Sequence, residues 1–92
     1  MQNYKKTISD NICYTKLVYD RINKKLDWEL SEAEIEVMVS KIIHETDESA
    51  FQKIGKNIYI SNIQRNTKLT INSFTNRIIT ADKLNKTLPT PC

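Results

Sequence analysis

Glycine is nearly absent from this 92-residue chain, and its scarcity narrows the chemistry that the chain can perform. Gly55 is the only glycine. A glycine-rich loop, which lets the backbone approach a phosphate closely, therefore cannot be built. The sequence argues against a nucleotide-hydrolysing P-loop enzyme and against a dinucleotide-dependent enzyme.

Metal ligands and nucleophiles are equally scarce. His44 is the only histidine, and Cys13 and Cys92 are the only cysteines, so a four-ligand zinc site of the common type is not expected. No base lies near Cys13 in the sequence to activate it, and we expect it to be a small buried side chain. His44 lies about 180° from Ile35 on a helical wheel, which predicts exposure to solvent; a general base is the alternative. We expect no metal and no cofactor, and we favour a non-enzymatic protein.

Long apolar runs and a secretory leader are also missing, and two cysteines offer no disulfide framework. These absences predict a reduced, soluble, cytoplasmic protein without a membrane partner. The length predicts one domain, residues 1–88, because this is enough chain to bury a modest core. Residues 89–92 are expected to be a loose tail, since Pro89 and Pro91 cannot extend a β-ladder.

Charge is distributed unevenly along the chain. Residues 1–50 contain 7 basic and 10 acidic residues, a net charge of −3. Residues 51–92 contain 7 basic residues and only Asp82 as an acid, a net charge of +6, and the two parts sum to the formal +3. The second part therefore predicts a positive field that attracts polyanions or acidic protein surfaces, with a solvated basic face as the alternative.

Helical periodicity is confined to the first part of the chain. Apolar residues recur at steps of three and four from Ile8 to Leu26, which predicts a helix over residues 8–26. A second helix is predicted from Ser31 to about Thr46, because Ser31 and Glu34 are spaced as a capping box and an apolar stripe follows. Trp28 lies between the two helices and is expected to bury their junction.

Strand signals fill residues 51–81. Apolar residues alternate with polar ones in two segments, around Ile58–Ile60 and around Leu69–Ile71, and a third strand is predicted at 77–81. A fourth strand at 51–54 would precede Gly55, which suits the first position of a type II′ turn. The sequence thus predicts an α+β fold: two N-terminal helices packed on one face of a three- to four-stranded antiparallel meander.

The sheet surface that faces away from the helices is the candidate binding site. Tyr59, Lys68 and Thr70 are expected to point outward, joined by cations from the third strand and the loops. The predicted binding residues are Lys56, Tyr59, Arg65, Lys68 and Arg77. An aromatic ring among cations and amides suits single-stranded nucleic acid, because cations hold phosphates and the ring stacks on a base.

Three functions remain open from the residues alone. The first is a non-enzymatic module whose basic sheet face docks on nucleic acid or a ribonucleoprotein. The second is a phage- or plasmid-type inhibitor or regulator that binds an acidic protein surface. The third is a small metal-independent ribonuclease of the toxin kind. An unpaired edge strand would also allow a homodimer through sheet extension.

Four segments along the chain carry a resemblance to a known family: Ile12–Tyr19, Gly55–Ile60, Leu69–Asn72 and Arg77–Asp82. They resemble a small bacterial family, the domain of unknown function number 3781. The resemblance implies a bacterial or mobile-element origin, and the family has no established activity to carry over.

The predicted fold has helices followed by an antiparallel meander whose last strand contains a threonine, Thr80. This arrangement is similar to that of the barnase, colicin and RelE group of ribonucleases. Those enzymes cleave RNA with histidine, lysine, arginine or threonine groups on a sheet face. The positions that match are His44, Lys56, Arg65, Arg77 and Thr80. This chain departs from the group in having no second histidine and no glutamate on its strands.

Overall fold

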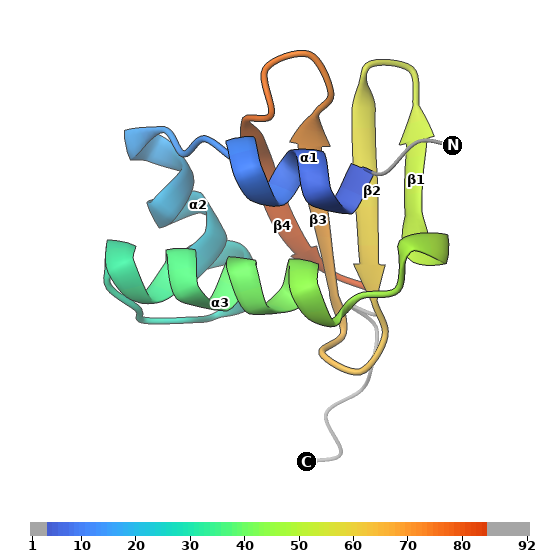
Figure 1. Cartoon of the computed structure of the whole chain (residues 1–92). Coiled ribbons are helices and arrows are strands. Elements are labelled where there is room, and N and C mark those ends of the chain that lie inside the picture. Colours follow the sequence, from blue (N-terminus) through green and yellow to red (C-terminus); the bar gives the residue numbers. More distant parts are fainter. Residues whose placement is uncertain (1–3, 85–92) are drawn as a thin grey trace.

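A computed structural model describes residues 4–84, which form three helices followed by a four-stranded antiparallel sheet (Figure 1). The helices are α1 (Tyr4–Asn11), α2 (Lys16–Leu26) and α3 (Glu32–Glu45), and a single 3-10 turn (Glu48–Ala50) leads into the sheet. The strands are β1 (Phe51–Ile54), β2 (Asn57–Asn62), β3 (Thr67–Asn72) and β4 (Ile78–Lys83), in the order β1-β2-β3-β4. The predicted α+β meander is confirmed with four strands, and the predicted tail at 89–92 lies outside the described residues.

The first predicted helix is in fact two helices, because the chain leaves the helical path between Asn11 and Lys16. There the backbone of Cys13 pairs with the start of β4: its N–H donates to Asn76 O at 2.8 Å, and its carbonyl accepts from Ile78 N at 3.0 Å. Backbone groups bonded to the sheet cannot also serve a helix. The apolar spacing continues across the break, so the periodicity gave no sign of it.

The break also corrects the prediction for Cys13, which is exposed rather than buried. A residue in a bridge to a strand end no longer belongs to the apolar face of a helix. The core side chains of this region come instead from the two flanking helices, Ile8 in α1 and Val18, Ile22 and Leu26 in α2.

The start of α3 agrees with the sequence prediction. The Ser31 hydroxyl accepts from Glu34 N at 3.2 Å, and the Glu34 carboxylate accepts from Ser31 N at 2.8 Å, which completes the capping box. The backbone N–H of Ser31, and after it the Ser31 side chain, favour the charged carboxylate and hold the pKa of Glu34 below its ordinary value. The capping box thus satisfies two backbone donors that the first turn would otherwise leave unpaired.

Replacing Ser31 with alanine is expected to lower the free energy of unfolding by about 1 kcal/mol, because the Glu34 amide loses its acceptor. Urea unfolding of the two proteins would measure the difference. Ser40→Ala is the matched control, since Ser40 lies exposed within the same helix and alanine favours a helix interior. Equal midpoints for Ser31→Ala and the wild type would contradict the role of the cap.

One face of the sheet carries the core. Side chains of the two inner strands, β2 and β3, alternate between buried and more exposed positions as the period of two requires, except that Thr70 of β3 is also buried. The inner face packs against apolar residues of the helices, and α1 and α3 lie across it (Figure 1). Its fully or almost fully buried members are Phe51, Ile58, Ile60, Leu69, Ile71, Ile78 and Ala81.

The two edges of the sheet differ. Beside β4, helix α2 packs along the strand, and Arg21 Nη1 donates to Ile79 O at 3.5 Å. A bulge at this point lets both Ile78 and Ala81 face the core, three positions apart. At the other edge, β1 pairs with β2 and with no other strand of residues 4–84. A homodimer through sheet extension, as predicted, would therefore use β1.

Candidate functional site

The outer sheet face, opposite the helices, is the surface on which the predicted binding residues were expected to gather. None of the described helices lies across it (Figure 1). The strand register places Tyr59 between Gln52 and Thr70, and Thr70 beside Thr80. With their neighbours these residues define the face: Gln52, Asn57, Tyr59, Ser61, Lys68, Thr70, Asn72, Thr80 and Asp82.

Tyr59 and Lys68 form the centre of this face. Lys68 Nζ lies 5.6 Å from the centroid of the Tyr59 ring, within the range of a cation–π contact. The two residues are diagonal neighbours on adjacent strands, because Tyr59 pairs with Thr70 and Lys68 with Ser61. The predicted association of an aromatic ring with a cation on the outward side is therefore present.

Lys56 and Arg77 lie at the end of the sheet that carries the β1–β2 and β3–β4 turns. Lys56 is in the two-residue turn between β1 and β2, after Gly55, whose φ of 63° fits the positive value that a type II′ turn needs there. The Lys56 carbonyl accepts from both N and Oγ of Ser73, at 2.8 and 2.9 Å, which ties this turn to the β3–β4 turn. Arg77 follows that turn and is exposed; since Ile78 is buried, alternation turns Arg77 outward.

Arg65 is the predicted residue that the structure separates from the others. It lies in the β2–β3 turn and forms a bidentate ion pair with Glu45 at the end of α3, with Nε–Oε1 and Nη2–Oε2 distances of 2.7 and 2.8 Å. The hydrogen bonds from Arg65 hold the pKa of Glu45 below its usual range, and those to Glu45 raise the pKa of Arg65. Arg65 therefore fastens the turn to the helix layer.

One acidic residue lies on the outer sheet face. Asp82 is opposite Lys68 in the β3–β4 register. It also forms an ion pair with Lys25 of α2, at 3.4 Å. The charge of Asp82 is therefore partly balanced by a cation from the helix layer.

The positions that match the ribonuclease group are not assembled into one site. Thr80 lies on the outer sheet face. His44 is exposed on α3, in a shallow hollow shared with Lys5, Ser9 and Glu48, and Arg65 is bound to Glu45. The sheet therefore separates the histidine from the threonine, and no acid–base pair forms between them.

An apolar groove on α3 was not predicted as a surface feature. Trp28 packs partly against the core at the junction of α2 and α3, as predicted, but it also borders a hollow of about 500 Å³. Val37, which is 54% exposed, lies in this hollow. The spacing of apolar residues in α3 predicted correctly which side of the helix is buried. The same spacing could not show that the opposite side stays open beside Trp28.

Two absences hold for residues 4–84. Among them no group of three or more histidine, cysteine or acidic side chains is placed to hold a metal ion. Within the same range, no helix has the length and apolar character that a membrane span requires.

Comparison with known protein families finds a match over most of the chain. A family model described as "Protein of unknown function (DUF3781)" matches residues 6–82. No curated protein and no solved structure matches the chain, so the resemblance to ribonucleases gains no structural neighbour.

Proposed function

The chain belongs to the DUF3781 family of proteins of unknown function, and we propose from its surface chemistry that the outer sheet face binds single-stranded nucleic acid. The observation that carries the proposal is the Tyr59–Lys68 pair at the centre of a face that none of the described helices covers, with Lys68 Nζ 5.6 Å from the ring centroid. Tyr59 is half-buried, and its ring offers a surface on which any base can stack while the neighbouring ammonium group neutralises the phosphate next to that base.

The cations are distributed as a strand of nucleic acid would need them. Lys68 lies near the end of the sheet that carries the β2–β3 turn. Arg77 and Lys56 lie at the opposite end, which carries the β1–β2 and β3–β4 turns. A backbone that crosses Tyr59 would therefore meet positive charge before and after the stacked base. Asp82 is the one acid on this face, and its ion pair with Lys25 reduces its repulsion of a phosphate.

Uncharged groups on the same face supply contacts to bases and sugars. Asn57 and Asn72 are half-buried cross-strand partners near the β1–β2 turn, and the half-buried Thr80 pairs with Thr70, which is itself buried beside Tyr59. Amides and hydroxyls both donate and accept, so they suit the exposed edges of unpaired bases. A cytoplasmic location, where single-stranded RNA is abundant, is part of this proposal.

Salt dependence tests the proposal against the inhibitor alternative. Fluorescence anisotropy with labelled single-stranded RNA and DNA should give log K that falls with log salt by about 0.7 for each phosphate contacted, or about 2 for Lys56, Lys68 and Arg77 together. Sequence should matter little. A protein that inhibits by binding an acidic protein surface would leave all of these oligonucleotides unbound, and that result would overturn the proposal.

Replacing Tyr59 with alanine is expected to weaken oligonucleotide binding by about 5- to 150-fold, because one base–aromatic stack contributes about 1–3 kcal/mol. Tyr59→Phe retains the ring and should bind within about twofold of the wild type, since stacking needs no hydroxyl. Anisotropy titrations at one salt concentration would measure both. Equal losses in the two variants would assign the effect to the hydroxyl group and contradict stacking.

A further inference from the structure

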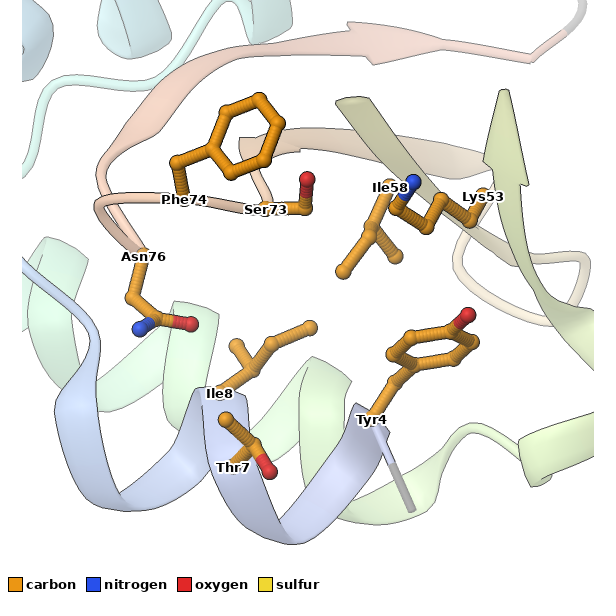
Figure 2. A pocket seen from close by; sticks show the side chains of 8 residues that line it. All are labelled: Tyr4, Thr7, Ile8, Lys53, Ile58, Ser73, Phe74 and Asn76. Atoms are coloured by element: carbon orange, nitrogen blue, oxygen red, sulfur yellow. The ribbon is translucent and has the colours of Figure 1, made fainter. Parts of the chain in front are cut away.

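A cavity of about 320 Å³ lies on the helix-covered face of the sheet, between α1 and the end that carries the β1–β2 and β3–β4 turns (Figure 2). Its volume is at the lower end of the range of about 300–1,000 Å³ typical of small-molecule sites. Three segments far apart in the sequence build it: α1, the β1–β2 hairpin and the β3–β4 turn. The lining residues are Tyr4, Thr7, Ile8, Lys53, Ile58, Ser73, Phe74 and Asn76.

The floor and one wall of the cavity are apolar. Ile8 and Ile58 belong to the hydrophobic core and are 0% and 3% exposed, so the cavity ends on closely packed side chains. Phe74 lies on the opposite side and is 77% exposed, and its ring borders the opening (Figure 2). A ring this exposed is not part of the hydrophobic core. It leaves an aromatic surface available to an apolar group that enters the cavity.

Lys53 supplies the only charge among the lining residues. It belongs to the row of the register that contains Ile58, Ile71 and Ile78, so it lies on the core side of the edge strand. Its Nζ donates to Gly55 O at 2.9 Å. An ammonium group has three hydrogens, so two are left for another acceptor.

Further polar groups surround the same opening. The Tyr4 hydroxyl lies across the cavity from the Phe74 ring, and the Asn76 side chain points into it from the turn (Figure 2). The Ser73 hydroxyl donates to Lys56 O, which leaves it able to accept only. Among residues 4–84 no acidic side chain lines the cavity, so the charge of Lys53 selects for an anion.

We propose that this cavity binds a small organic monoanion, a carboxylate attached to an apolar ring or branched chain. The carboxylate would accept from the Lys53 ammonium group and the Tyr4 hydroxyl. The apolar body would lie on Ile8 and Ile58 beneath Phe74. The site uses the helix-covered face of the sheet and is therefore independent of the proposed nucleic-acid interface.

A lysine on the core side of an edge strand has a second explanation. Inward-pointing charges protect open sheet edges against pairing with other chains. Under that explanation Lys53 has no ligand, and its removal should promote self-association through β1. The experiment must therefore observe ligand binding and oligomeric state separately.

Phenylacetate is a suitable probe, and 2-phenylethanol is a control with the same ring and no charge. Titration of the ¹⁵N-labelled protein should give saturable shifts at the amides of Ile8, Ile58, Ser73 and Asn76, with the alcohol binding more weakly. Lys53→Met retains the length of the side chain without its charge. It should weaken phenylacetate binding by at least about tenfold and leave 2-phenylethanol unchanged, since a hydrogen bond to a charged group is lost.

A second variant tests the apolar wall. Phe74→Ala removes an exposed ring, so the fold should be retained, and both probes should bind more weakly. Three results would overturn the site: no saturable shift at millimolar phenylacetate, equal phenylacetate affinity in Lys53→Met and the wild type, or shifts confined to other surfaces. If phenylacetate does not bind and Lys53→Met self-associates in sedimentation velocity, Lys53 only protects the edge. None of these results affects the proposal for Tyr59 and Lys68.

Discussion

Replacing Ile60 with alanine is expected to lower the free energy of unfolding by about 2–5 kcal/mol, a large share of the roughly 5–15 kcal/mol that stabilises a small domain. Ile60 lies at the centre of β2 and is 0% exposed. Its cross-strand partners are Phe51 and Leu69, and its side chain joins the cluster that the helices cover. Truncation removes buried apolar surface and leaves a cavity that rigid neighbours fill only in part.

Urea or thermal unfolding would measure this loss, and the chain offers a matched control. Ile63 carries the same side chain in the β2–β3 turn but is 85% exposed, so Ile63→Ala should change the free energy of unfolding by less than about 0.5 kcal/mol. Ile60→Val should fall between them, with a loss of about 0.5–1.5 kcal/mol. Equal losses for Ile60→Ala and Ile63→Ala would contradict the assignment of the buried face.

Reversing the charges of Lys68 and Arg77 together is expected to abolish oligonucleotide binding. The Lys68→Glu/Arg77→Glu variant removes two of the three proposed phosphate contacts and places repulsive groups beside Tyr59. The salt slope should fall by about 1.4, the share of two contacts, wherever binding is still measurable. The fold should persist, because both side chains point outward; Glu at position 68 opposite Asp82 costs only about 0.2–1 kcal/mol.

A control variant separates a local effect from one of net charge. Each lysine- or arginine-to-glutamate change lowers the charge by two, so the double variant shifts the formal charge from +3 to −1. Lys24→Glu/Lys41→Glu makes the same change on exposed positions of α2 and α3. It should retain most of the affinity. Equal losses in the two double variants, with thermal unfolding unchanged, would show that the outer sheet face is not the interface.

Local chemistry accounts for what the sequence predicted correctly. The capping box at Ser31 and Glu34 needs only residues three positions apart, and the alternation in β2 and β3 needs only neighbouring residues. The prediction that Tyr59 and Lys68 lie on the same side of the sheet followed from the same alternation once the two strands were assigned. Such local features can be predicted from the sequence because the residues that form them are close together along the chain.

Contacts between distant segments account for what the sequence did not predict. Nothing near Cys13 shows that its backbone will bond to Asn76 and Ile78 instead of continuing a helix. Likewise, Arg65 belonged with the other cations by charge, but Glu45, twenty positions earlier, holds it at 2.7 Å. Free backbone groups and free charges take the best partner in space, and that partner is known only after the layers have packed.

By itself the sequence determined the α+β class, the buried face of each strand, the start of α3 and the uneven division of charge, because each follows from periodicity or composition. The tertiary structure decided which cations share a surface, which edge of the sheet stays open, and that α1, Lys53 and Phe74 enclose a cavity. These outcomes depend on how α1 and α2 dock on the finished sheet, and residues as far apart in the sequence as Tyr4 and Asn76 meet only through that docking.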